Sequence, residues 1–277
     1  MRQMLRIAAM PLTGAGLGLL MWSGMTTALL QLRPGTPSTL HQLQLLGLLS
    51  GWILVAAGTL AGRADRVPPG VPRAARRLRL ATLAGAALLC VLLALAGSTT
   101  PAPAPLLVGL GLLSVLAAFG TVAAMAHGFA GPAAPAPWRQ PLVLPVQLLL
   151  AMSTGLALLY VLMDRLFVSG PDSRTMLATL TGLGVCLALC KGLYWRAVDR
   201  MPHPGAAVPA QRTARIAMLA LAAGAPALTW LLALSRQLPS WLPLLLAACA
   251  LGAAAALEHR LFLGEGAGWQ REAGHES

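Results

Sequence analysis

The chain has 277 residues, of which 57% are hydrophobic and 10% are charged, and its formal net charge is +12. A soluble domain carries roughly 25% charged residues, so this composition excludes an ordinary water-soluble protein. Long apolar runs satisfy their backbone in lipid as α-helices, and the short alternating segments of a β-barrel are not found in the sequence. The sequence therefore predicts an all-α integral membrane protein.

Eight apolar stretches are long enough to cross a membrane, because a span needs about 20 residues. Clusters of Pro and Gly, such as "RPGTP" (33–37) and "PPGVP" (68–72), separate them and end helices. We expect transmembrane helices over residues 7–32, 41–62, 78–97, 106–130, 141–163, 175–195, 214–235 and 240–263. Together they form a single transmembrane domain over residues 1–277, which we expect to pack as two four-helix bundles.

The basic residues are distributed unequally between the two sides of the membrane. Eight spans put both termini on one side, and that side, with three of the loops, holds sixteen Lys and Arg residues: Arg2, Arg6, Arg63, Arg66, Arg73, Arg76, Arg77, Arg79, Arg139, Lys191, Arg196, Arg200, Arg212, Arg215, Arg260 and Arg271. The other side holds Arg33, Arg165, Arg174 and Arg236. Basic loops stay in the cytoplasm, so we expect both termini to be cytoplasmic. The richness in Arg, Ala, Leu and Gly is typical of a bacterial protein, and the expected location is the bacterial inner membrane.

Polar side chains near the ends of the spans are the candidates for chemistry, because polar groups in a bilayer are costly and mark function. Glu258 lies 17 residues past Trp241, which is about 26 Å along a helix, so it reaches the inner margin of the hydrocarbon. A carboxylate at this depth is a candidate proton acceptor. The alternative is that Glu258, His259 and Arg260 end the span by reaching the headgroups. Glu265 follows on nearly the same helix face.

Two other classes of function remain open from the residues alone. A haem would need two facing histidines at one depth, and His127 and His259, near the inner ends of the fourth and eighth spans, are the pair that geometry allows. A transporter would show broken helices or charges at the centre of the membrane. No charge lies at the centre of an expected span, which counts against ion-coupled transport without excluding it.

Four stretches, taken in order, resemble the anchor-subunit family of dimethyl sulfoxide reductase, the C-subunit family. "LTGAGLGLLMWSG" (12–24) is similar to its Gly-rich first span, and residues 119–159 look like its fourth and fifth spans. "KGLYWRAVDR" (191–200) resembles the basic and aromatic end of its sixth span, and "LEHRLFLGEG" (257–266) resembles its final span. The eight expected spans agree with this family.

The resemblance implies a membrane anchor that oxidises menaquinol and passes electrons to an iron–sulfur subunit, which serves a molybdopterin catalytic subunit. It implies no haem or metal in this chain. One departure concerns the family's "HLGRP"-like stretch, whose His is associated with the quinol site. Here the matching stretch reads "LAGRADRVPPG" (60–70), and Ala61 stands where that His would be. The competing interpretation is a small-molecule transporter, or another polytopic membrane protein without a redox role.

The quinol-site candidates are therefore Glu258, Arg260, Arg63 and His127. Glu258 is the expected proton acceptor, and the two arginines are expected to contact quinol oxygens or an acidic surface of the partner. We expect the aromatic side chains of Trp138, Tyr194 and Trp195 to anchor the protein at the membrane interface, as aromatic belts do.

Overall fold

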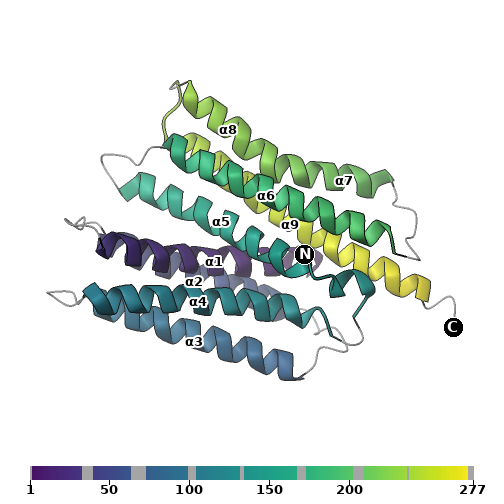
Figure 1. Ribbon diagram of the computed structural model, residues 1–277, viewed down its shortest axis with the longest axis horizontal. Coiled ribbons are helices and arrows are strands. Elements are labelled where there is room, and N and C mark those ends of the chain that lie inside the picture. Colours follow the sequence, from purple (N-terminus) through teal and green to yellow (C-terminus); the bar gives the residue numbers. More distant parts are fainter. Residues whose placement is uncertain are drawn as a thin grey trace.

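The computed structural model describes residues 2–32, 40–63, 73–98, 104–131, 134–166, 173–201, 209–235 and 237–273. The long elements of these segments are all helices (Figure 1). They are α1 (Arg2–Gln31), α2 (Leu40–Arg63), α3 (Arg73–Gly97), α4 (Ala104–Gly128), α5 (Val143–Leu166), α6 (Ser173–Asp199), α7 (Pro209–Leu219), α8 (Ala225–Leu234) and α9 (Trp241–Ala273). A short 3₁₀ helix, η1 (Ala136–Arg139), precedes α5, and a π-helical turn, η2 (Ala220–Gly224), joins α7 to α8.

Eight helical segments of the described residues are long and apolar enough to span a membrane. They are Ile7–Gln31, Leu40–Gly62, Arg76–Gly97, Ala104–Gly128, Val143–Leu166, Ser173–Asp199, Gln211–Leu234 and Trp241–Ala267. Each end lies within four residues of the end predicted from the sequence. The protein is therefore an all-α, multi-pass membrane protein, as its composition predicts.

The seventh span contains the π-helical turn, and proline chemistry accounts for it. Pro226 lies just inside α8 and has no backbone N–H, so it cannot bond the carbonyl of Ala222 four residues earlier, and its ring would crowd that carbonyl. The wider π turn relieves the crowding. A side-chain carbon added at Gly184 of α6 would meet the Ala222 carbonyl oxygen, so the glycine leaves room for this bulge.

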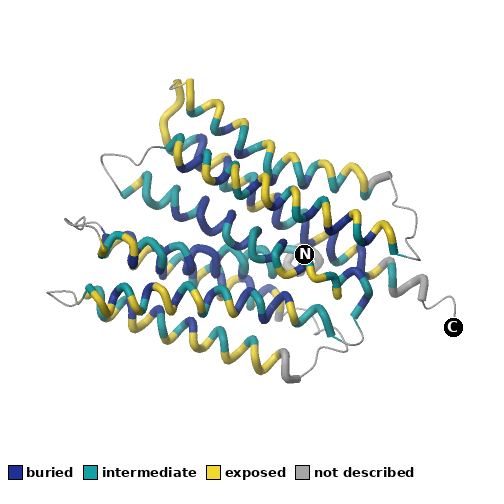
Figure 2. Tube along the Cα trace, viewed as in Figure 1, coloured by how far each residue is buried: buried dark blue, intermediate teal, exposed yellow. Residues whose placement is uncertain are grey.

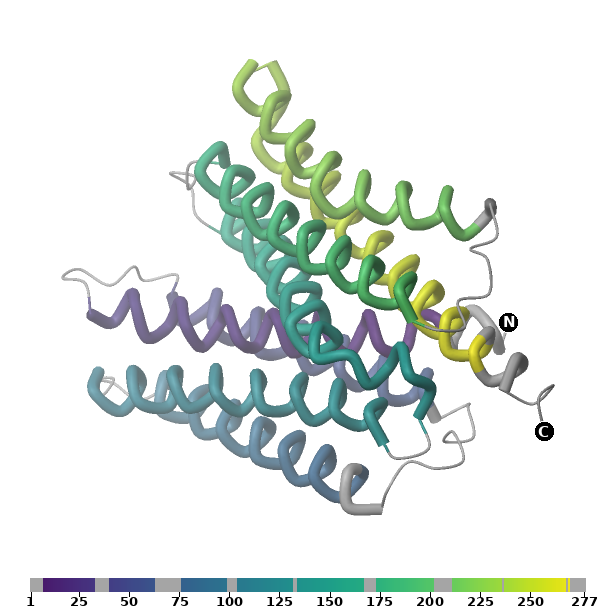
Figure 3. Tube along the Cα trace, turned by 45° about the vertical axis from the view of Figure 1, so that its right-hand side comes forward, coloured from purple at the N-terminus to yellow at the C-terminus, as the bar shows by residue number. Residues whose placement is uncertain are grey.

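The helices form two bundles that are joined along α1 and α5 (Figure 1, Figure 3). Helices α1, α2, α3 and α4 pack against one another, and α5, α6, α9 and the α7–α8 span form the second group. At the junction, a side-chain carbon on Gly18 would meet the carbonyl oxygen of Ala151, and one on Gly155 would meet the backbone of Gly18. The two backbones therefore touch directly, which is how small residues bring membrane helices together.

Exposed residues lie along the outward faces of the helices (Figure 2), and many of them are large and apolar. Large aliphatic side chains such as Leu49 on α2, Leu88 on α3, Leu116 on α4 and Leu189 on α6 are about 60% or more exposed. A soluble protein rarely exposes so much contiguous apolar surface. In a membrane protein these side chains face the lipid tails, so the exposed surface fits the hydrocarbon core.

The beginning of α1 and the end of α9 lie at the same end of the molecule (Figure 3), as an even number of spans requires. We call this the terminal end. The polar cluster described next lies in the second bundle, near this end.

Candidate functional site: a buried charged cluster between α6 and α9

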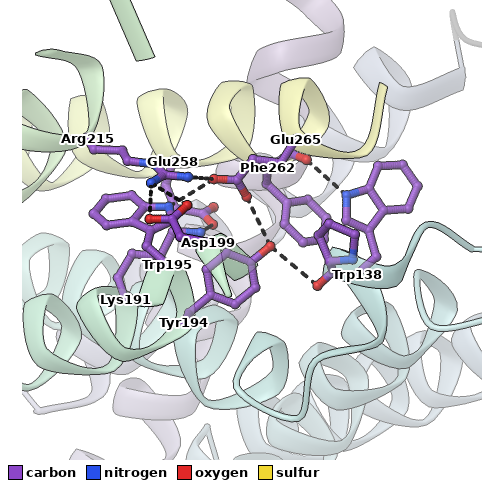
Figure 4. A network of polar contacts seen from close by, with 10 residues as sticks. Trp138, Lys191, Tyr194, Trp195, Asp199, Arg215, Glu258, Phe262 and Glu265 are labelled. Carbon is purple, nitrogen blue, oxygen red and sulfur yellow. Dashed lines mark hydrogen bonds and ion pairs between the residues drawn. The ribbon is translucent and has the colours of Figure 1, made fainter. Parts of the chain in front are cut away.

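Lys191 on α6 and Glu258 on α9 form an ion pair inside the second bundle (Figure 4). Lys191 Nζ lies 2.8 Å from Glu258 Oε1, and each side chain is only 1% exposed. Lys191 is 18 residues from the start of α6 at Ser173, and Glu258 is 17 residues from the start of α9 at Trp241. At 1.5 Å per residue these are depths of about 27 and 26 Å, so parallel helices bring the two charges to one level.

Aromatic rings surround the lysine. Its Nζ lies 4.0 Å from the centre of the Tyr194 ring, 5.3 Å from Trp195 and 6.0 Å from Phe262. An ammonium group near an aromatic face is stabilised by the ring quadrupole, and more strongly where water is excluded. The ammonium group of Lys191 is thus enclosed by one carboxylate and three rings.

A second buried carboxylate, Glu265, binds the polar ends of two of these aromatic residues (Figure 4). Tyr194 Oη donates a hydrogen bond to Glu265 Oε2 at 3.0 Å, and Trp195 Nε1 donates to Oε1 at 3.0 Å. Arg215 on α7 lies 3.4 Å from Glu265 Oε1 and also donates to both carboxylate oxygens of Asp199, at 3.0 and 2.9 Å. Because the Asp199 side chain is 51% exposed, the polar contacts extend from the buried cluster to the surface.

The 3₁₀ helix η1 covers the terminal-end side of this cluster. Trp138 Nε1 donates a hydrogen bond to the carbonyl oxygen of Phe262 at 2.9 Å, and the two rings stack with their centres 5.3 Å apart. A side-chain carbon on Gly266 would meet the Trp138 ring, so the absence of a side chain there lets the indole lie flat on α9. The η1 segment is therefore fixed to α9 beside the carboxylates.

Glu258 also lines a small cavity between α1, α5 and α9. The other polar side chains around it belong to Gln147, Thr154 and His259, and the apolar part of the lining includes Met10 and Pro11. Glu258 Oε2 is buried and receives no hydrogen bond from the residues that the structure describes. The cavity has a volume of about 20 Å³, which is enough for one water molecule and too small for a quinone ring, because ligand pockets measure roughly 300–1,000 Å³.

The energetics of this cluster favour a functional explanation. Moving two charges out of water costs several kcal/mol per ion, and an apolar pair of similar volume is often equally stable or more so. Charged side chains inside a membrane are accordingly rare and are associated with substrate or proton pathways. Stability alone gives little reason for Lys191 and Glu258 to be where they are.

The four quinol candidates lie in different environments. Glu258 is buried in the cluster, whereas His127 at the end of α4 and Arg260 on α9 are exposed. Arg63 ends α2, and its side chain lies outside the described residues. Of these candidates, the structure places Glu258 in an enclosed site, and it adds Lys191 and Glu265 to that site.

The structure corrects one sequence interpretation and adds to another. Tyr194 and Trp195 were expected in an interfacial belt, but they are 1% and 6% exposed and face the cluster, because α6 turns them toward α9. Lys191 was counted among the basic residues of the cytoplasmic side, and the structure shows that its side chain is only 1% exposed, between α6 and α9. Without it that side still holds fifteen basic residues against four, so the predicted orientation is unchanged. Its status as the only lysine of the chain was the available signal.

These features define a polytopic α-helical membrane protein with a cluster of ionisable side chains buried in its second bundle. In the described part of the chain, no group of three His, Cys, Asp or Glu side chains is placed to hold a metal ion. Comparison with protein-family models, curated protein sequences and solved structures finds no match to this chain.

Proposed function

We propose that the chain is the membrane anchor and menaquinol-oxidising subunit of a reductase of the dimethyl sulfoxide reductase type, in a bacterial inner membrane. It would hold an iron–sulfur subunit and a molybdopterin catalytic subunit to the bilayer. The support from the sequence is the resemblance to that family's anchor subunits. Its two most specific stretches, 191–200 and 257–266, are the ones that supply the buried cluster.

The observation that carries the proposal is the position of Glu258. One of its carboxylate oxygens binds Lys191, and the other has no partner among the described residues. The same side chain lines the small cavity. A carboxylate with one free oxygen is suited to accept a proton, and general bases act at hydrogen-bond distance from the proton that they take. Glu258 is therefore placed for proton acceptance at the margin of the membrane.

Menaquinol oxidation to menaquinone releases two electrons and two protons. In the proposed reaction the electrons leave to the iron–sulfur subunit, and Glu258 accepts the two protons one after the other, each passing on to water before the next arrives. The quinol ring approaches through the small cavity, so Met10 and the first turns of α1 must move aside. Arg63 ends α2, and Arg260 lies two residues past Glu258 on α9. Both are proposed to contact quinol oxygens or acidic residues of the partner, and His127 remains a candidate ligand.

The departure at Ala61 restricts where quinol is bound in this proposal. Ala61 is 9% exposed on α2 and has no side chain that can bond a quinol oxygen. Recognition of the quinol hydroxyls would then depend on the second bundle, where Glu258, Gln147 and Thr154 line the same cavity.

One observation favours the competing function, a small-molecule transporter. The sequence shows no charge at the centre of an expected span, but Lys191 and Glu258 are buried together nearer the terminal end of their helices. Ion-coupled transporters use such groups to bind substrate or coupling ions. The two functions differ in their partners, because a transporter has no need of an iron–sulfur subunit.

Affinity purification of the tagged protein in mild detergent tests the proposal. We expect an iron–sulfur subunit and a molybdenum-containing subunit to copurify, and the membranes to oxidise a menaquinol analogue in the presence of the terminal acceptor. Glu258→Gln should assemble and lose most of this activity. Asp164→Asn is the matched control, because Asp164 lies near the last residue of α5, far along that helix from the Gln147 and Thr154 that line the cavity. This variant should retain the activity. A complex without an iron–sulfur protein, together with membranes without quinol-dependent reduction, would contradict the anchor function.

Reporter fusions at the C-terminus test the proposed orientation separately. The basic residues predict a cytoplasmic signal. A periplasmic signal would overturn the orientation but would leave the quinol proposal to be judged by its own experiment.

A further inference from the structure

Lys191 has more partners than an ion pair needs. Its ammonium group binds Glu258 and also lies over the rings of Tyr194 and Trp195. The polar ends of these two rings both donate to the carboxylate of Glu265. The two aromatic residues thus stabilise a cation with their faces and bind an anion with their polar ends. We name the group of Tyr194, Trp195 and Glu265 the aromatic arm.

The charges of the cluster balance when both buried carboxylates are ionised. The charged and titratable groups around Lys191 in the described residues are Glu258, His259 and Glu265 on α9, Tyr194 and Asp199 on α6, and Arg215 on α7. Lys191 and Arg215 offset Glu258 and Glu265, and Asp199 adds a partly exposed negative charge. When Glu258 is protonated, Lys191 loses its nearest counter-charge, and a buried charge without compensation is strongly unfavourable.

We propose that Lys191 is a positioning residue that compensates charge for Glu258, and that the aromatic arm stabilises the Lys191 ammonium group while Glu258 carries a proton. In this state the proton resides on the Glu258 carboxyl group, Lys191 keeps its own proton, and the ammonium group turns from Oε1 toward the ring of Tyr194 and toward Glu265. Loss of the proton from Glu258 to water restores the ion pair. The proposal rests on the proposed role of Glu258 as a proton acceptor and assigns the residues that make this role possible.

The residue type fits this function. Lys191 is the only lysine among the twenty Lys and Arg residues of the chain. Lysine is a compact point charge on a flexible stem, whereas the planar guanidinium of arginine favours one fixed bidentate geometry. A lysine can exchange a carboxylate for an aromatic face by rotating its stem. A purely structural ion pair would have no use for this freedom, and it would leave no oxygen of Glu258 unbonded.

Chemical labelling of Glu258 tests the proposal without any quinol. The full-length protein in lipid vesicles is treated with dicyclohexylcarbodiimide, which reacts with protonated carboxyl groups in membranes, and the peptide that contains Glu258 is quantified by mass spectrometry across a pH series. In the wild-type protein, labelling should rise as the pH falls. In Lys191→Met, Glu258 has lost its cation, and we expect it to be labelled to a high and nearly constant extent at every pH. Arg196→Met, at an exposed position of the same helix, should behave as wild type.

A pair of substitutions at Tyr194 tests the aromatic arm by itself. Tyr194→Phe keeps the ring face, so the pH dependence of labelling should stay near that of the wild type. Tyr194→Leu removes the face without changing any charge, so we expect the labelling of Glu258 to begin about one pH unit lower, that is, at tenfold higher proton concentration. These variants decide the proposal even if Lys191→Met does not fold.

Two results would overturn the proposal. One is a Lys191→Met protein that is labelled with the same pH dependence as the wild type. The other is equal behaviour of the Tyr194→Leu and Tyr194→Phe proteins. Because the labelling requires no quinol and no partner subunit, its outcome is separate from that of the proposed function. If the wild-type protein oxidises quinol but the variants are labelled like the wild type, only the role of Lys191 is rejected. If the variants are labelled as expected but the wild-type protein does not oxidise quinol, only the anchor function is rejected.

Discussion

The two bundles bury different kinds of polar side chain. In the described residues of α1–α4, the buried polar side chains are uncharged: Thr13, Ser23, Thr27, Gln44, Ser114 and Thr121. Several of their hydroxyls bond the carbonyl four residues earlier in their own helix, as Thr13 does to Ala9 and Thr121 to Ala117. The second bundle also buries such uncharged side chains, Ser153 and Thr154 among them, but in addition it buries the ionisable Lys191, Glu258, His259 and Glu265.

The difference separates a scaffold from a site. Hydroxyls that bond within their own helix carry no charge into the membrane, so the first bundle is held together by close packing. The second bundle contains charges that packing does not require, and it places them together at one depth. Away from the α1 residues that line the Glu258 cavity, a disturbance of the first bundle should therefore affect stability alone. A disturbance of the cluster should affect both stability and proton chemistry.

The largest effect is expected from breaking the ion pair in the second bundle. Lys191→Met leaves the buried Glu258 carboxylate without its cation, so this variant alone should destabilise the protein by about 3–5 kcal/mol. Glu258→Gln should cost less, because the three rings around Lys191 still stabilise its ammonium group. The double variant removes both charges and should recover much of this loss. Unfolding of the three variants in detergent measures the coupling, and a double variant as unstable as the sum of the single ones would contradict the pairing.

The next effect is expected at the junction between the bundles. Gly18→Val places side-chain carbons where the Ala151 carbonyl oxygen lies, and overpacking typically costs about 1–3 kcal/mol. Gly14→Ala is the matched control on the same helix, because its added carbon would lie 4.0 Å from the Ala151 side chain, an ordinary contact. Thermal unfolding in detergent should therefore distinguish the two variants, and equal loss in both would mean that α1 and α5 are not in direct backbone contact.

A smaller effect is expected where η1 covers the cluster. Trp138→Phe retains an aromatic ring on Phe262 but removes the hydrogen bond from Nε1 to the Phe262 carbonyl. A hydrogen bond contributes about 0.5–1.5 kcal/mol. Protease sensitivity of the 134–142 segment, compared with that of a Trp230→Phe control in α8, measures the release of η1. If Trp138→Phe is no more sensitive than the control, the hydrogen bond does not hold the segment.

The smallest effect is expected at the exposed edge of the cluster. Asp199 is 51% exposed in its pair with Arg215, and exposed ion pairs are worth about 0.2–1 kcal/mol and are screened by salt. Asp199→Asn should cost no more than this at low salt, and its difference from the wild type should shrink as salt is added. A large loss of stability that does not depend on salt would show that the Asp199–Arg215 pair is coupled to the buried cluster and is not an exposed ion pair.

The spans could be predicted well because lipid imposes a simple rule. A run of about 20 apolar residues must be helical to satisfy its backbone, and Pro and Gly clusters mark where it ends. Glu258 could also be singled out, because an acid at the end of an apolar helix is visible in a linear sequence. The face of α9 that carries Glu258 and Glu265 follows from their spacing, and both side chains are indeed buried.

The sequence by itself determined the class of protein, the number of spans and the depth of Glu258, because these depend on composition and on distances along one helix. Only the tertiary structure decided that Lys191 faces inward, that Tyr194 and Trp195 bind Glu265, and that Trp138 reaches α9. These contacts join residues 67 to 124 positions apart. Their physical reason is the parallel alignment of α6 and α9, which sets two separate helix faces against each other at the same depth and which no local pattern encodes.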